Sequence, residues 1–320
     1  MANGVSFTEA QAYKDFVEEF ANELYSDIFF GFPTANIAMA HEGVKGKKVL
    51  TELMLADNLA TRWAAPYVGT ANTSYLPEVL EVVTNKVEHS VIPQEFESSY
   101  LGMMRRQGQS SDDYPFQAYV LGKLIEKLAS EMEVAFWQGE AAAVPATSDL
   151  LRETFDGILK QVADKIVATD LTPVATGVST AANIIANMRT MWAQVSTVDK
   201  NSGMDIYVSY VDYDLIRIAF KDTYKVDIAY TEINSSDYEG MFFELGGRNT
   251  RIIPVPGMGT SRRIIMHRPG NLHYGMDALG EWANFDFEKN HRQLDFWNDF
   301  NFGVLGTQLR DGIAVVNDQA

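Results

Sequence analysis

The longest helical pattern in the chain covers residues 112–139, and it limits the possible folds more than any other stretch. Its apolar residues recur at three- and four-residue steps, which places them on one side of a helix with roughly 3.6 residues per turn. These residues are Leu121, Leu124, Ile125, Leu128, Met132 and Ala135. Asp112 or Asp113 can cap the first turn, and Pro115 falls within that turn without losing a hydrogen bond. At about 1.5 Å per residue the helix would be about 35–40 Å long, so we expect it to support the sheets of the molecule.

The charged residues of this stretch fall on the remaining faces of the helix. They are Lys123, Glu126, Lys127, Glu131 and Glu133. Lys127 and Glu131 have the spacing of a weak surface pair. We therefore expect one buried face and a solvated remainder, a pattern that is also typical of core helices in other α+β proteins.

Helices and strands are expected on both sides of the long helix. Thr8 and Gln11 have the spacing of a capping box that opens a helix over residues 8–27, and the aromatic run 29–33 is expected to be anchored. Further helices are expected over residues 148–168, 179–195 and 213–220. Strands are expected over residues 79–83, 86–93, 205–210, 251–256 and 262–267, with a hairpin-like pair over 281–288 and 291–297. This order predicts a helix-and-sheet layer.

Residues 49–75 follow no sustained helical or strand period. The stretch holds Trp63 and Tyr67 among small and polar residues, so it is too apolar for a free linker and too irregular for a core element. We expect it to pack on a surface outside its own domain. Lys45, Lys47 and Lys48 form a small basic cluster at the solvated base of this stretch.

Composition excludes several classes of protein. The chain has 320 residues and a formal net charge of -17, from 26 Lys plus Arg against 43 Asp plus Glu, which argues against sequence-specific binding of nucleic acid. It has no cysteine, and therefore no disulfide, thiolate metal site or cysteine nucleophile. Its start lacks the basic and apolar segments of a signal peptide, and no apolar run is long enough to span a membrane. We expect synthesis in the cytoplasm.

No pattern for catalysis or cofactor binding stands out. Residues 43–48 lack the spacing of a phosphate-binding loop, and Gly257 and Gly259 lack the third glycine of a dinucleotide site, so a tight turn is favoured there. The five histidines are scattered along the chain and lack the spacing of a zinc pair: His41, His89, His267, His273 and His291. We expect no catalytic residues, no cofactor-binding residues, no metal site and no cofactor.

The order of the elements is more informative than any single motif. From the arm and helix to the final antiparallel sheet, nearly the whole chain resembles the major capsid proteins of tailed bacteriophages, which have the Hong Kong 97-type fold. The most specific parts are residues 133–139 at the end of the long helix, residues 155–158, and residues 254–259 followed by Asn271, Leu272 and Gly275.

This resemblance implies an α+β fold in five parts. They are an N-terminal arm and helix (1–43), an extended loop (44–75), a peripheral domain with a spine helix and β-sheet (76–149), an axial α/β domain (150–266) and a return to the peripheral domain (267–320). Family members that carry a fused scaffolding segment have more chain before the loop, so here the resemblance implies a separate scaffolding protein or none.

The implied function is that of a non-enzymatic major head protein. Copies would self-assemble into hexamers and pentamers of an icosahedral shell, built in the host cytoplasm and present in the virion. The implied partners are the chain itself, a portal, a scaffolding protein and decoration proteins, with no membrane. The acidic charge suits a shell that encloses double-stranded DNA without binding a sequence.

Two alternatives remain open from the sequence. The first is an encapsulin, the shell protein of a bacterial nanocompartment with the same fold, for which a purified shell would hold protein cargo and have no portal. The second is an acidic soluble enzyme of unknown class, for which a stable monomer with a deep pocket is expected.

Overall fold

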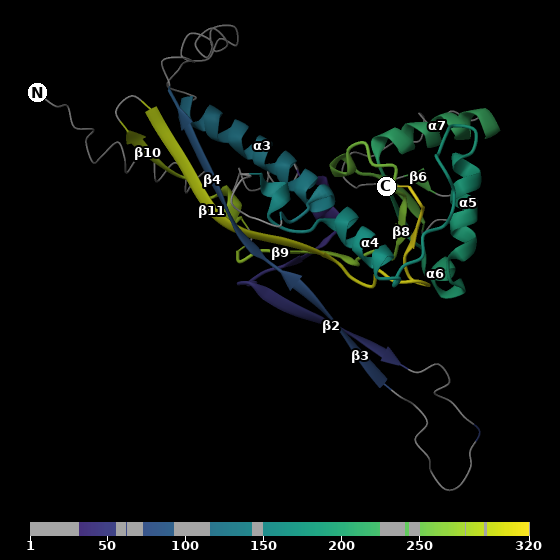
Figure 1. Ribbon diagram of the computed structural model, residues 1–320. Helices are drawn as coiled ribbons and strands as arrows, with labels where there is room; N and C mark the ends of the chain where they lie inside the picture. Colours follow the sequence, from purple (N-terminus) through teal and green to yellow (C-terminus); the bar gives the residue numbers. More distant parts are fainter. Residues whose placement is uncertain are drawn as a thin grey trace, which may run out of the picture.

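The computed structural model describes residues 32–55, 62, 73–92, 116–142, 150–224, 241–242, 250–278, 280–290 and 293–319. The helix expected over residues 8–27 lies outside these ranges, as do Trp63, Tyr67 and His291. Among the described residues, no helix is both long enough and apolar enough to span a bilayer. Figure 1 shows two lobes joined beside a long helix, and a two-stranded ribbon that projects away from them.

Helix α3 (Phe116–Gln138) is the long helix that the sequence predicts, with 23 residues and a length of about 34 Å. Its predicted apolar stripe is confirmed, because Leu121, Ile125, Leu128, Met132 and Ala135 are all buried. Lys127 and Glu131 form the expected surface pair at 3.2 Å. Glu133 is an exception: it is 3% exposed, so the expectation of a solvated residue is wrong there.

The first sheet lies beside α3 in Figure 1, and the two share one apolar core. Its strand order is β1 (Met39–His41), β9 (Leu272–Gly275), β11 (Gln293–Gly306) and β10 (Asp286–Asn290), with β4 (Val83–Val91) also paired to β11. The antiparallel β10–β11 pair confirms the expected hairpin, although β11 runs on to Gly306 and residues 281–283 form a 3₁₀ turn (η6, Glu281–Ala283). Phe32 anchors the start of the described chain here, packing edge-on against Phe136 and Phe302.

The second sheet forms the core of the other lobe. Its order is β12 (Val315–Val316), β8 (Ile265–His267), β5 (Asp205–Val208), β7 (Arg251–Pro254) and β6 (Met241–Phe242). Helices α5 (Ile184–Gln194), α6 (Thr197–Ser202) and α7 (Tyr210–Tyr224) complete this lobe in Figure 1. Every residue of β5 is buried, as expected for a central strand with neighbours on both sides. The predicted helix-and-sheet layer is confirmed, with α7 longer than the expected helix and the strands shorter than expected.

Two helices begin later than the sequence predicts. The single helix expected over residues 148–168 is a 3₁₀ turn (η2, Leu151–Glu153) followed by α4 (Ile158–Val167). The break lies at Gly157, whose backbone packs so closely on the end of α3 that a Cβ there would lie 2.5 Å from the Gly139 nitrogen. Helix α5 starts at Ile184 instead of Ser179, because the Asn183 side chain accepts hydrogen bonds from the Thr180 backbone and hydroxyl and holds residues 180–183 in a turn.

Two short elements pack with a different region from the one to which the sequence assigns them. Helix α4 falls in the expected axial domain, yet Ile158 and Val162 are buried in the same core as α3. Strand β12 falls in the expected return to the peripheral domain, yet it pairs with β8 in the second sheet. The last described residues of the chain therefore fasten the second lobe.

Candidate functional site

The projecting ribbon consists of β2 (Lys47–Leu55) and β3 (Thr73–Glu81), paired antiparallel from Lys47 opposite Glu81 to Leu55 opposite Thr73. The sequence prediction of an irregular stretch over residues 49–75 is wrong at both ends, which are regular strands. Pro77 explains the error at the β3 end, because a proline normally argues against a strand but is tolerated on an edge strand. In a two-stranded ribbon both strands are edges.

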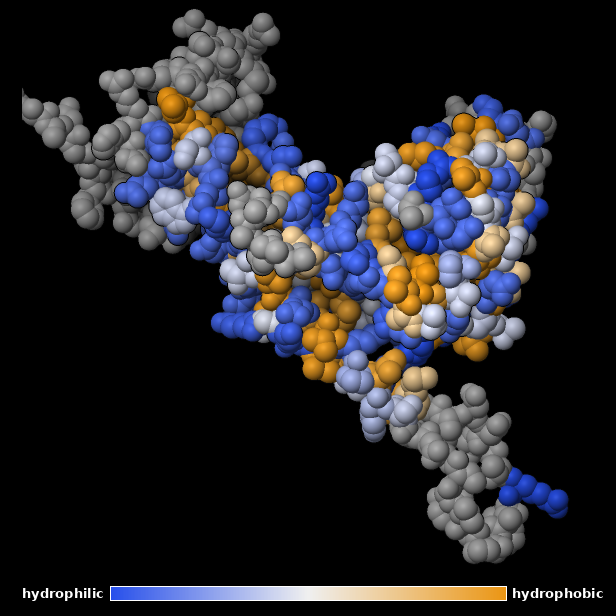
Figure 2. Space-filling view, viewed as in Figure 1, coloured by the Kyte–Doolittle hydropathy of each residue, from blue (hydrophilic) through white to orange (hydrophobic). Residues whose placement is uncertain are grey.

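One face of the ribbon is apolar and open to solvent. Alternate residues of a strand point to opposite sides, so the register sorts the side chains into two faces. The apolar face carries Val49 opposite Val79, Thr51 opposite Pro77, and Leu53 opposite Tyr75. The four largest apolar side chains of this face are between 46% and 68% exposed. In Figure 2 hydrophobic residues gather where the ribbon leaves the body.

Such a surface is unusual for a lone chain. A two-stranded hairpin is marginally stable by itself, and exposed edge strands with apolar side chains promote pairing with another molecule. The apolar face of the ribbon is therefore the strongest candidate for a contact surface among the described residues.

The opposite face of the ribbon is fixed to the body by two carboxylates. Glu52 Oε1 accepts hydrogen bonds from Gln308 Nε2 at 2.7 Å and from Arg310 Nη2 at 2.7 Å. Both oxygens of Glu78 accept from the Gln308 backbone nitrogen, at 3.0 and 3.2 Å. We call residues 307–310 the anchor turn. The Gln308 side-chain oxygen in turn accepts from Asn271 Nδ2 at 2.8 Å, so this one residue links the ribbon to the body.

The pKa values of the two anchoring carboxylates are shifted in opposite directions. The hydrogen bond from Arg310 holds the pKa of Glu52 below its ordinary value. Burial raises the pKa of Glu78, and the backbone hydrogen bond from Gln308 only partly opposes this effect. Gln308 has φ +57°, a left-handed conformation that is uncommon for a residue with a side chain. The anchor turn is therefore held in place by its contacts.

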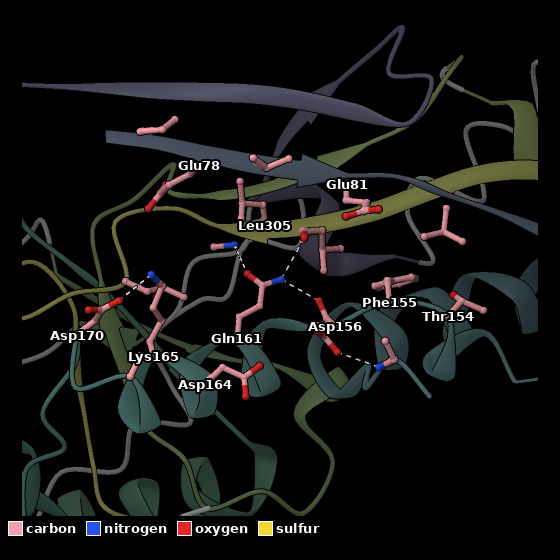
Figure 3. A pocket seen from close by; sticks show the side chains of 18 residues that line it. Glu78, Glu81, Thr154, Phe155, Asp156, Gln161, Asp164, Lys165, Asp170 and Leu305 are labelled. Atoms are coloured by element: carbon pink, nitrogen blue, oxygen red, sulfur yellow. Dashed lines mark hydrogen bonds and ion pairs between the residues drawn. The ribbon is translucent and has the colours of Figure 1, made fainter. Parts of the chain in front are cut away.

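A cleft of about 720 Å³ lies between the root of β3, helix α4 and the end of β11. Figure 3 shows its carboxylates, which are Glu78, Glu81, Asp156, Asp164 and Asp170. Lys165 pairs with Asp170 at 3.0 Å. Gln161 spans the cleft wall, donating to the Val304 carbonyl oxygen at 3.1 Å and accepting from the Gly306 nitrogen at 2.9 Å. Gln161 therefore holds α4 against β11 beside the ribbon root.

A buried carboxylate joins three segments at the centre of the molecule. Glu133 of α3 accepts hydrogen bonds from the Thr34 hydroxyl at 2.7 Å, the Thr34 nitrogen at 3.1 Å and the Gly257 nitrogen at 3.4 Å. Burial raises its pKa. A Cβ at Gly257 would lie 2.3 Å from the Glu133 carbonyl oxygen, so only glycine fits. Gly257 and Gly259 form the tight turn that the sequence predicts, at η5 (Pro256–Met258).

The histidines are less scattered than the sequence suggested. His41 of β1 and His273 of β9 lie side by side, with His41 Nε2 3.0 Å from His273 Nδ1. His267 is buried in β8, and His89 is exposed on β4. No sequence signal brings together two histidines 232 positions apart. Within the described ranges, no group of three or more His, Cys, Asp or Glu residues could hold a metal ion.

Comparison with known proteins identifies the fold. No family model matches the sequence, and no curated protein matches it. Among solved structures, the satellite phage P4 procapsid matches with a TM-score of 0.55 and 11% identity, over 92% of this chain and 98% of that chain. Gordonia phage Cozz matches with a TM-score of 0.52 and 10% identity, over 89% and 85% of the two chains.

A third match is the capsid of an empty GTA particle, with a TM-score of 0.52, 9% identity and coverage of 90% and 89%. Identities this low show the fold alone. The matches nevertheless extend over nearly the full length of both partners in each case. The chain therefore has the fold of the phage major capsid proteins.

Proposed function

We propose that this chain is the major capsid protein of a tailed double-stranded DNA bacteriophage. Copies of it would form hexamers and pentamers of an icosahedral shell in the virion, after assembly in the host cytoplasm. The fold supports a shell role, since two of the structures named above are described as a procapsid and a capsid. The observation that carries the proposal is the apolar face of the ribbon. This face is exposed to solvent, while the opposite face is hydrogen-bonded to the body at the ribbon root.

The ribbon gives the chain a means of joining identical copies. It projects beyond the body, so its apolar face can lie on a neighbouring copy while its root stays fixed through Glu52 and Glu78. Such a contact uses different surfaces of the two partners, and repeated contacts of this kind form rings when the rotation between successive copies closes. Rings of five and six copies are the units of an icosahedral shell.

The size of the apolar face is sufficient for a useful contact. Complete burial of a Val, Leu or aromatic side chain contributes about 1.5–3 kcal/mol. Val49, Leu53, Tyr75 and Val79 are each about half exposed, so covering them would contribute about 3–6 kcal/mol per ribbon before association costs. Weak contacts that are repeated around a ring allow assembly while permitting errors to be corrected.

We propose the same division of the chain as the sequence suggested, with two changes. The arm (1–43), extended loop (44–75), peripheral domain (76–149), axial domain (150–266) and return (267–320) remain the regions. Helix α4 is assigned to the peripheral domain because it packs against α3 and its Gln161 hydrogen-bonds to the backbone of β11. Strand β12 is assigned to the axial domain because it pairs with β8.

The remaining parts of the proposal concern chemistry and partners. We propose no catalytic role, and we propose a portal, a scaffolding protein and decoration proteins as partners. The net charge of -17 would limit binding of the enclosed DNA to the shell wall. The matches are to phage capsid structures and do not favour an encapsulin or an acidic enzyme.

The test is assembly of a chain whose apolar face carries a charge. Leu53→Asp is expected to leave the chain folded and to prevent shells, measured by light scattering and electron microscopy, because a carboxylate cannot be buried on a neighbour without a partner. Val178→Asp is the matched control, since Val178 is 65% exposed in a loop away from the ribbon. Normal shells from the Leu53 variant would contradict the proposal.

A further inference from the structure

A continuous series of hydrogen bonds runs from the root of the ribbon into the first sheet. Lys48 Nζ of β2 lies 3.1 Å from His41 Nδ1. His41 Nε2 lies 3.0 Å from His273 Nδ1, and His273 Nε2 lies 3.1 Å from the Thr307 hydroxyl. That hydroxyl donates to the Asn271 carbonyl oxygen at 3.2 Å. The series therefore ends in the anchor turn and the strand beside it.

Only one arrangement of protons satisfies the whole series. The Lys48 ammonium can only donate, so His41 Nδ1 must accept and the His41 proton lies on Nε2. His41 Nε2 then donates to His273 Nδ1, which places the His273 proton on its Nε2, facing the Thr307 hydroxyl. Both rings are therefore neutral, and every hydrogen bond in the series points in the same direction.

An added proton on either ring breaks this series. On His41 it occupies Nδ1 and faces the Lys48 ammonium; on His273 it occupies Nδ1 and faces the His41 Nε2 proton. At neutral pH the charge that acts on the pair is that of Lys48 from β2, and among the described residues neither ring pairs with a carboxylate. A proton on His41 or on the buried His267 of β8 would further disfavour a proton on His273. Burial is the main cause that lowers the pKa of both rings, and it brings the pKa of His273 to about 4.

The ribbon root is also attached to the body outside this series. Its apolar contacts with the body form a small cluster of Val44, Leu80 and Val82 with Leu305 packed against them. The two carboxylates on the anchoring face add contacts through Gln308 and Arg310. Just before β2, the Gly43 and Val44 nitrogens donate to the carbonyl oxygens of residues 277 and 276. Loss of the histidine series would therefore weaken the Lys48 contact, one of several attachments that fix the start of β2.

We propose that the His41–His273 pair is an acid-sensitive latch, which helps to hold the ribbon root against the first sheet at neutral pH through Lys48 and loosens it when the pair gains a proton. The consequence for a shell, in which released ribbons would change how copies contact each other, rests on the proposed function. The latch itself is a property of the single chain and can be tested without assembly.

The direction of the pH effect follows from the pKa shift. The released or unfolded form binds a proton with a pKa near 6.5, and the latched form with a pKa of about 4 for His273. Release is therefore favoured progressively as the pH falls below about 6.5, and the effect levels off below about 4. For His273 alone this difference changes the latch equilibrium by at most about 30-fold between neutral pH and pH 5, a limit reached when release returns the ring to its ordinary pKa.

Hydrogen–deuterium exchange of β2 in the full-length chain tests the latch. After correction for the pH dependence of intrinsic exchange, opening of β2 is expected to rise from pH 7.5 to pH 5, by at most about 30-fold. The double variant His41→Gln with His273→Gln cannot titrate and is expected to lose this dependence. His89→Gln changes an exposed histidine on β4 and is expected to keep it. Equal pH dependence in the double variant would overturn the latch.

Nitrogen chemical shifts of the histidine rings provide a second measurement on the unaltered chain, in case the double variant does not fold. At pH 7.5 both rings are expected to carry their proton on Nε2 alone. A proton on Nδ1 of either ring would overturn the proposal. Both measurements use unassembled chains, so a failure to form shells would contradict the proposed function and leave the latch intact.

Discussion

Replacing Glu133 by alanine is expected to cost far more stability than replacing a neighbouring glutamate on the same helix. Glu133 accepts three hydrogen bonds that join α3 to Thr34 and Gly257. The variant leaves the two Thr34 donors without this acceptor in the interior, and each unsatisfied buried group costs about 1–3 kcal/mol. Removing a partly desolvated carboxylate returns some of this energy. We expect a net loss of about 2–4 kcal/mol in the free energy of unfolding.

The assay is urea denaturation of the full-length chain, with Glu131→Ala as the matched control. Glu131 lies two positions away, is about half exposed and forms only a surface pair with Lys127, so its loss is expected to change stability by less than about 0.5 kcal/mol. The variant Glu133→Gln separates charge from hydrogen bonding. Because burial raises the pKa of Glu133, the native chain loses stability as the pH rises through that pKa, and the glutamine variant is expected to lose this dependence. Equal unfolding midpoints for Glu133→Ala and Glu131→Ala would refute the reasoning.

Two further substitutions test the junctions that fix the ribbon and the long helix. Gly257→Ala places a methyl group 2.3 Å from the Glu133 carbonyl oxygen, so we expect a loss of about 1–3 kcal/mol in thermal or urea unfolding, and an unchanged midpoint would contradict the close packing. Arg310→Ala removes a donor to Glu52, which is about four-fifths buried, so we expect a loss of about 1–2 kcal/mol at neutral pH and faster hydrogen exchange in β2. Because Arg310 lowers the pKa of Glu52, the cost of this variant is expected to shrink as the pH falls through that pKa, and a cost that is the same at pH 3 and pH 7 would argue against the pair.

The parts of the fold that depend on local pattern could be predicted from the sequence. The stripe of α3 follows from helical periodicity, and the tight turn at Gly257 and Gly259 follows from the glycines themselves. The break before α4 was missed because it depends on Gly157 meeting Gly139 across the fold, and nothing in residues 148–168 signals that contact.

The candidate site could be predicted only in part. The sequence pointed to residues 49–75 as a contact region because of their apolar content, but the two faces of the ribbon appear only when the β2–β3 register pairs Leu53 with Tyr75 and places Glu52 on the other side. Glu133 has the same spacing as solvated glutamates, and its burial is decided by Thr34, 99 positions away. The His41–His273 pair likewise arises from a parallel strand pairing, β1 with β9, that no local pattern encodes.

The central claim is that the apolar face of the ribbon is covered by a neighbouring copy, and a single cysteine tests it most directly. The chain has no cysteine, so Leu53→Cys introduces a unique site for a maleimide probe. We expect the labelling rate to fall at least about tenfold between dispersed chains and assembled shells, because Leu53 is 52% exposed in the lone chain and would be buried in the contact. Ser74→Cys, on the opposite face of the same ribbon, is expected to change less. An equal labelling rate of Leu53→Cys before and after assembly would contradict the claim.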